Sequence, residues 1–143
     1  MIKVFLDTDI ILDLLLKREP FHYSAYKIFT SIENRHITGY TSPLVIANLH
    51  YILTKLLKKE KSIEIIKDLL QILKLTTIDE EIILKIFLHK KIKDFEDLIQ
   101  YYSAKEFFIE FLITRNIKDY PESTNDIKII SSEKFVSLFL SGC

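Results

Sequence analysis

Short apolar segments alternate with longer amphipathic ones along most of the chain. Ile2–Leu6 is a run of mostly apolar, branched and aromatic residues that stops at Asp7, which is typical of a buried strand. Four further strands are predicted, at Ile37–Thr41, Leu75–Ile78, Phe111–Ile113 and Lys128–Ile130. Because helical segments fall between these strands, we expect an α/β fold, a three-layer α/β/α arrangement around a central, mostly parallel sheet.

The predicted helices carry apolar residues at intervals of three and four positions. The clearest, Leu44–Leu57, follows Ser42 and Pro43, which read as an N-cap and a proline at the first helical position. Asp79 is expected to cap a helix that ends at Leu88. One helix should follow Asp7-Thr8-Asp9 and run to Lys17, and the others are predicted at Ser24–Glu33, Ser62–Leu73, Phe95–Phe108 and Glu133–Leu140.

Length and composition narrow the possible functions. The 143 residues predict a single domain over 1–143. The two glycines, Gly39 and Gly142, lie far apart, so neither a phosphate-binding P-loop nor a dinucleotide-binding turn can form. The single cysteine, Cys143, excludes a disulfide framework and a cysteine-based zinc site.

Charge is balanced over the whole chain but not along it. The 20 basic and 20 acidic side chains give no overall preference for nucleic acid or membrane. Lys90, Lys91 and Lys93 nevertheless cluster directly before Asp94, either as a solvated helix end or as a rim for a polyanion. No segment has the ~18 uncharged apolar residues of a membrane span, and no signal peptide is evident, so we expect a cytoplasmic protein without membrane contact.

Acidic and amide side chains follow several predicted strands or begin helices. Asp7 follows the first strand, and Asn116 and Asp119 follow the strand Phe111–Ile113. In a parallel sheet, ligands bind beyond the carboxyl ends of the strands. Asp94 and Asp97 are three residues apart and share a helical face. These acids either form a site or serve locally, with Asp94 as a cap and Thr8 or Asp9 capping the first helix.

Two polar residues point toward expected core positions. Asp97 begins the stripe of Tyr101, Ala104 and Phe108, and Asn48 lies among apolar neighbours one turn away on its helix. A buried carboxylate is costly unless it is paired or bound to a cation. Carboxylates that converge on one cleft are usually held by Mg²⁺ or Mn²⁺, and such a site can polarise a phosphate and activate water.

Four segments together resemble the PIN-domain family of metal-dependent ribonucleases, which includes toxins of toxin–antitoxin pairs. The first is Val4–Asp9, the second Thr41–Leu53, the third Asp94–Ala104, and the fourth Ile113–Asn116 with Asp119 and Tyr120. Their order and spacing cover nearly the whole chain. In the second segment Asn48 stands where the family usually has Glu.

The resemblance implies a divalent-metal-dependent ribonuclease that acts on single-stranded RNA, with an antitoxin protein as a possible partner. Asp7 and Asp97 would be the principal ligands of Mg²⁺ or Mn²⁺, Asp94, Asn116 and Asp119 secondary ligands, and Asn48 a weakened one. The expected catalytic residues are Asp7, Asp94, Asp97 and Asn116, and those expected to contact RNA are Thr8, Arg115, Lys90, Lys91 and Lys93. Because Asn48 brings no charge, a catalytically weakened RNA- or partner-binding module is the alternative.

Two further alternatives remain open. Leu6–Ile11 also resembles the first motif of haloacid-dehalogenase-type phosphatases, with Asp7 as nucleophile and Asp9 as general acid. The helices between Leu44 and Leu73 carry more Leu and Ile than one face can bury. They therefore indicate either a thick core or a surface for a homodimer or an antitoxin.

Overall fold

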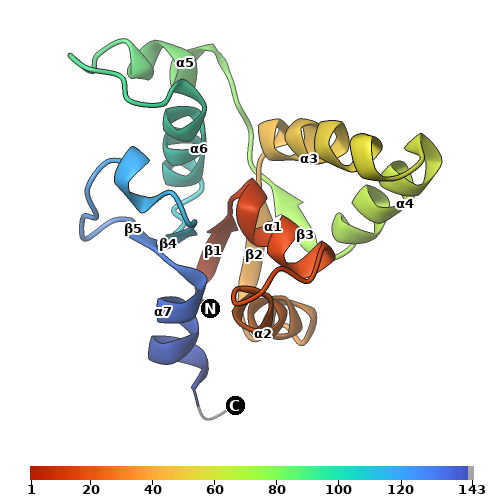
Figure 1. The fold of residues 1–143 in the computed structure, drawn as a ribbon. Helices are drawn as coiled ribbons and strands as arrows, with labels where there is room; N and C mark the ends of the chain where they lie inside the picture. The colour runs from red at the N-terminus through yellow and green to blue at the C-terminus, as the bar shows by residue number, and fades with distance from the viewer. Residues whose placement is uncertain (142–143) are drawn as a thin grey trace.

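The protein is built around a five-stranded parallel sheet, in a computed structural model that describes residues 1–141 (Figure 1). The strands lie in the order β3-β2-β1-β4-β5, so that β1 is central. Their bounds are β1 (Lys3–Leu6), β2 (Thr38–Thr41), β3 (Leu73–Leu75), β4 (Phe111–Ile113) and β5 (Lys128–Ile130). The predicted α/β fold with a parallel central sheet is confirmed. Cys143 lies outside the described residues.

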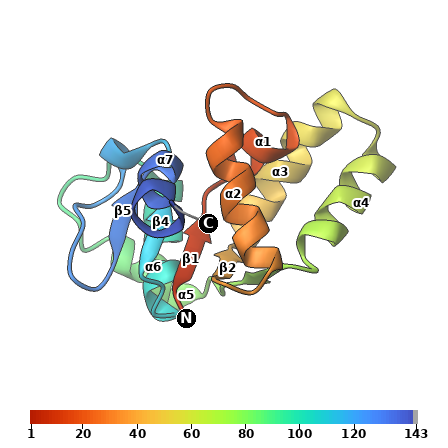
Figure 2. The ribbon, with the colours of Figure 1, turned by 90° about the horizontal axis from the view of Figure 1, so that it is seen from below.

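Helices cover both faces of this sheet, as Figures 1 and 2 show. Helices α5 and α6 lie on one side, α1, α2 and α7 lie on the other, and α3 and α4 form a hairpin beyond α1. No helix within residues 1–141 is long and apolar enough to cross a membrane. The bounds are α1 (Thr8–Leu15), α2 (His22–Glu33), α3 (Pro43–Leu56), α4 (Lys59–Leu69), α5 (Glu80–Ile86), α6 (Phe95–Glu106) and α7 (Ser132–Phe135).

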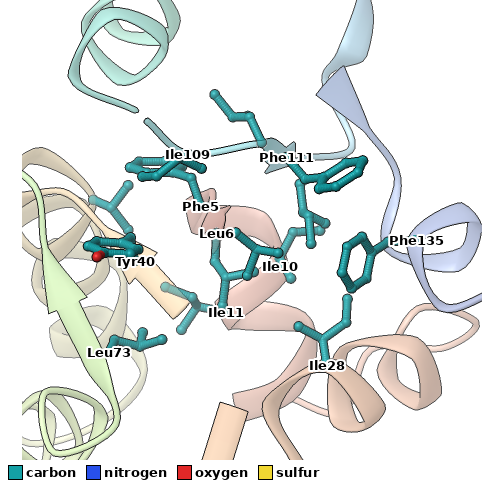
Figure 3. Close-up of a cluster of buried hydrophobic side chains, with 14 of the residues drawn as sticks. Phe5, Leu6, Ile10, Ile11, Ile28, Tyr40, Leu73, Ile109, Phe111 and Phe135 are labelled. Atoms are coloured by element: carbon teal, nitrogen blue, oxygen red, sulfur yellow. The ribbon is translucent and has the colours of Figure 1, made fainter. Parts of the chain in front are cut away.

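The core packs around β1 (Figure 3). Phe5 and Leu6 are fully buried, and Phe135 of α7 packs edge-on against Phe111 with ring centroids 5.5 Å apart. On β2, a Cβ atom at Gly39 would stand 2.6 Å from the Ile32 side chain of α2. The glycine therefore lets α2 approach the sheet closely.

The register of the strands brings their carboxyl ends to one edge. Leu6 of β1 pairs with Ile113 of β4, which in turn pairs with Ile130 of β5. The Asp7 N–H donates to the Ile113 carbonyl at 3.1 Å, and the Thr114 N–H donates to Ile130 at 3.0 Å. Asp7 and Thr114 therefore leave the sheet side by side, although 107 positions separate them.

Several element boundaries differ from prediction. The helix expected at Ser62–Leu73 is α4, which begins at Lys59 and ends at Leu69. The strand expected at Leu75–Ile78 is β3, Leu73–Leu75, because Leu73 is its buried residue and not a helical one. The last helix starts at Ser132 and continues beyond Phe135 as a π-helical turn over Val136–Leu140. Phe108, expected in the buried stripe after Asp97, follows the end of α6 and is 83% exposed.

Two predicted helix starts are confirmed by their capping hydrogen bonds. The Ser42 hydroxyl accepts from the Val45 N–H at 3.1 Å, with Pro43 as the first residue of α3. Asp79 accepts from the Ile82 N–H at 3.0 Å at the start of α5. At the start of α1, however, the cap is Asp7 and neither Thr8 nor Asp9.

Candidate metal centre

A cleft of about 510 Å³ opens at the carboxyl edge of the sheet. Its walls come from the residues after β1, the middle of α3, the start of α6 and the loop after β4. Most of its polar groups are oxygen atoms of acids and amides. The lining residues are Asp7, Thr8, Asp9, Leu12, Arg18, Asn48, Tyr51, Ile52, Asp94, Glu96, Asp97, Gln100 and Asn116.

Asp7 is the most firmly positioned of these acids. It ends β1 and caps α1, with its Oδ1 accepting from the Thr8 N–H at 2.8 Å. Its Oδ2 accepts from the Thr114 hydroxyl at 2.8 Å and from the Tyr120 hydroxyl at 2.9 Å. The carboxylate is therefore held on the cleft wall by three donors from α1, the end of β4 and the loop that follows.

Asp94 and Asp97 reach the same cleft from the first turn of α6. Asp94 is the N-cap, and its Oδ1 accepts from the Asp97 N–H at 3.0 Å, so the residue serves both as a cap and as part of the cleft. Asp97 is buried, and its Oδ2 has no hydrogen-bond partner. Together with Asp119, these two residues bring carboxylate oxygens within 4.8 Å of one another.

The concentration of acids changes their protonation. Burial, together with the negative charges of Asp7, Asp94 and Asp119, raises the pKa of Asp97 to about 7. Burial, together with Asp7, likewise raises the pKa of Asp9 to about 6. Burial also raises the pKa of the Tyr120 hydroxyl well above its usual range, so this group donates to Asp7 as a neutral phenol. A cation between these carboxylates would relieve both the burial and the mutual repulsion.

The residues present fit a hard divalent cation. The donor set is made of carboxylate and amide oxygens, which are the ligands of Mg²⁺ and Mn²⁺. A buried and unpartnered oxygen, Asp97 Oδ2, stands in the group and lacks the partner that such atoms normally have. The acidic cluster can therefore hold a divalent cation.

Most of the site residues predicted from the sequence line this cleft, and a few do not. Six of them line it: Asp7, Asp94, Asp97, Asn48, Asn116 and Thr8. Asp119 belongs to the acidic cluster, but it lines a neighbouring hollow that also includes Lys91 and Lys93. Lys90 is exposed and lines neither.

Arg115 is engaged away from the cleft. Its guanidinium lies 3.1 Å from the buried carboxylate of Asp13 on α1 and 4.2 Å from the ring centre of Phe21. Its backbone N–H donates to Asp9 Oδ2 at 3.1 Å. Arg115 therefore joins the loop after β4 to α1 and positions Asp9.

The polar cleft residues that the predicted ribonuclease site did not include are Asp9, Arg18, Tyr51, Glu96 and Gln100. Asp9 could have been included, because it lies two positions after the first acid of the strand. Arg18 follows the end of α1 and Tyr51 lies on α3, and no local pattern marks either as part of a site.

The comparisons with known proteins agree with this geometry. A family profile described as PIN domain matches residues 3–118. The chain belongs to the PIN-domain family. It is 29% identical over 138 residues to Ribonuclease VapC1 of Aquifex aeolicus, across 93% of this chain and 92% of that protein. This membership leaves the phosphatase alternative without support.

Solved structures share the fold. VapBC-1 from nontypeable Haemophilus influenzae superposes with a TM-score of 0.65 at 21% identity, over 92% of this chain and 99% of that one. VapBC2 from Rickettsia felis, bound to a DNA fragment from its promoter, gives 0.63 at 21% identity, over 90% and 97%. The sarcin-ricin loop cleaving toxin VapC20 from Mycobacterium tuberculosis gives 0.60 at 13% identity, over 76% and 86%.

Proposed function

We propose that the protein is a divalent-metal-dependent ribonuclease that hydrolyses phosphodiester bonds in single-stranded RNA, and that Mg²⁺ or Mn²⁺ is its cofactor. The observation that carries this proposal is the buried Asp97 carboxylate, whose Oδ2 has no hydrogen-bond partner, in one open cleft with Asp94 and Asp7. The similarity to a ribonuclease along nearly the whole chain supports the same chemistry.

The chain's own residues have separate tasks in this proposal. Asp7, Asp94 and Asp97 would hold the cation, with Asn116, Asp119 and the neutral Asn48 in weaker or orienting roles. When bound, the cation supplies Lewis-acid activation of the phosphate and of a water molecule. Thr114 and Tyr120 keep Asp7 oriented through their hydroxyl groups.

Single-stranded RNA fits the walls of the cleft. Tyr51 lines it and is 63% exposed, and exposed aromatic rings beside such a groove stack on unpaired bases. The neighbouring hollow is lined by Lys91, Lys93 and Asp119, and the two lysines would contact phosphates of the strand there. Such contacts position the strand without reading its sequence.

The decisive experiment is cleavage of an oligoribonucleotide in Mn²⁺. Asp7→Asn and Asp97→Asn should abolish cleavage while leaving the far-ultraviolet circular dichroism spectrum unchanged. Asp68→Asn is the matched control, because Asp68 is an exposed aspartate of α4 outside the cleft. Cleavage that persists in EDTA would rule out the metal mechanism.

Asn48 favours a second candidate, an RNA- or partner-binding module with little catalysis. Its amide lines the cleft, so Asn48→Glu tests both candidates directly. In a working site the added carboxylate should tighten Mn²⁺ binding by about tenfold, if about 1.4 kcal/mol is gained. In a binding module it should add an unpaired charge and lower the melting temperature with no gain in Mn²⁺ affinity.

We further propose an antitoxin partner and self-association. The solved relatives include complexes named as VapBC and as a toxin–antitoxin complex from Klebsiella pneumoniae. Exposed apolar residues gather on α3 and α4, where the sequence predicted such a surface: Tyr51, Leu56, Leu57, Ile63 and Leu70. A second group lies at α5, at α6 and in the segments that follow each of them: Leu84, Phe87, Leu88, Ile92, Phe95 and Phe108.

A further inference from the structure

Arg18 is the one cation among the residues that line the acidic cleft, within the described part of the chain. The same cleft is lined by the carboxylates of Asp7, Asp9, Asp94, Glu96 and Asp97. The arginine predicted to contact RNA, Arg115, is instead paired with Asp13. The cleft therefore contains a cation that the metal-binding role does not use.

The backbone of Arg18 is held firmly while its side chain is left available. Its N–H donates to the Asp13 carbonyl at 3.2 Å, and its carbonyl accepts from Phe21 at 3.0 Å and from His22 at 2.7 Å. Within residues 1–141, no carboxylate lies within ion-pair distance of its guanidinium, whose charge acts at longer range on the buried carboxyl of Asp13 and opposes the rise in the pKa of that group. The side chain is half-buried, so the wall of the cleft restricts its movement.

We propose that the Arg18 guanidinium binds a phosphate of the RNA strand across the cleft from the acidic cluster. This inference rests on the proposed ribonuclease function and assigns a substrate contact to it. An RNA strand entering a cleft of carboxylates needs a positive group besides the cation, because repulsion from acids that do not hold the cation would oppose its binding. A guanidinium can donate two parallel hydrogen bonds to one phosphate, which a single ammonium cannot do.

The test compares Arg18→Gln, Arg18→Lys and the control Arg35→Gln. Arg35 is an exposed arginine in a separate hollow beside Met1 and Gly39. In Mn²⁺, Arg18→Gln should lower kcat/KM for an oligoribonucleotide by about tenfold to a hundredfold, as loss of a charge-assisted hydrogen bond predicts. Arg18→Lys should fall between Arg18→Gln and the unchanged protein, and Arg35→Gln should match the unchanged protein.

RNA binding provides a measurement that does not depend on cleavage. In an Asp97→Asn background with Mn²⁺, fluorescence anisotropy should show that Arg18→Gln weakens binding and lowers the salt dependence by about 0.7 in log–log slope. Arg18→Gln that equals Arg35→Gln in affinity and slope overturns the inference. So does a change in Mn²⁺ affinity or melting temperature with RNA binding unchanged, which would make Arg18 a structural counter-charge.

The two proposals fail in distinguishable ways. If the unchanged protein cleaves no RNA in Mn²⁺ or Mg²⁺, the ribonuclease function is wrong, and the anisotropy measurement still decides whether Arg18 contacts RNA. If the protein cleaves and Arg18→Gln cleaves equally well, the ribonuclease function stands and the Arg18 inference is wrong.

Discussion

The buried Asp97 carboxylate lines the candidate metal site but lowers the free energy of unfolding when it is ionised. Its carboxylate is buried, has one unpartnered oxygen, and has a pKa raised to about 7. An unfolded aspartate titrates near 3.9, so between about pH 4 and pH 7 the folded chain holds a proton that the unfolded chain has released. The free energy of unfolding therefore falls as the pH rises through this range.

This linkage predicts the behaviour of Asp97→Asn in EDTA. The asparagine cannot ionise, so the variant should gain stability over the unchanged protein between pH 4 and pH 8. The gain should be at most about 4 kcal/mol, from about three pKa units at 1.36 kcal/mol each. Urea unfolding at each pH measures it, and Asp68→Asn should show no such pH-dependent gain.

Adding Mn²⁺ should make the unchanged protein more stable than Asp97→Asn. A cation that binds only the folded, ionised site stabilises the unchanged protein by an amount that rises with the logarithm of its concentration above Kd. Asp97→Asn should lose most of this increase in melting temperature. An equal increase in both proteins would place the bound cation elsewhere.

Several site residues could be predicted because their chain position alone carries the information. Asp7 and Asn116 follow strands, and Asp94 and Asp97 begin a helix, so parallel pairing brings all four to one edge. The remaining features depend on contacts across the chain. Tyr120 donates to Asp7 over 113 positions, and no local pattern indicates that pairing.

At the scale of elements, the loop after β4 is joined to α1 by the Arg115–Asp13 ion pair. Asp13 is fully buried, and burial raises the pKa of its carboxyl, with Arg115 acting in the opposite direction. Arg115→Met keeps much of the volume over Phe21 but removes the ion-pair partner of Asp13 and leaves it only the longer-range charge of Arg18. We expect a loss of about 3 kcal/mol in the free energy of unfolding near pH 8.

The pH dependence of this loss identifies its cause. Because the raised pKa of Asp13 lets it bind a proton as the pH falls, the loss in Arg115→Met should shrink toward pH 4. Asp13→Asn combined with Arg115→Met should recover part of the stability at pH 8. A loss of equal size at both pH values would instead point to the contact with Phe21.

Element boundaries were predicted well where a cap or a strand end marks them, and poorly elsewhere. Ser42, Pro43 and Asp79 locate two helix starts through capping chemistry. The segment between α4 and β3 has no such marker, and Leu69, Leu70 and Leu73 continue a helical spacing beyond the end of the helix. Only the pairing of Leu73 with Gly39 in the sheet decides that this residue is in a strand.

At the scale of the whole molecule, we expect self-association to use the second group of exposed apolar residues. These residues lie on α5 and α6 and in the segments that follow each helix. Leu88 is 82% exposed and borders the same hollow as the 83% exposed Phe108. Leu88→Glu with Phe108→Glu should convert a dimer into a monomer in light-scattering measurements, because charges there oppose burial. The second apolar surface is tested in parallel by Leu56→Glu with Leu57→Glu on the α3–α4 hairpin. Loss of the dimer in this hairpin variant alone would assign self-association to that hairpin.

The central position of β1 has a consequence for synthesis on the ribosome. Asp7 is made well before the hydroxyl groups that hold it, which come from Thr114 and Tyr120, 107 and 113 positions later. At ~5–20 residues per second, this interval lasts roughly 5–20 s. A nascent or prematurely terminated chain that ends before β4 also lacks the strand that pairs with one side of β1. The acidic cleft therefore forms only after the segment from β4 to Tyr120 has been made, and chains that end before it cannot carry the activity proposed here.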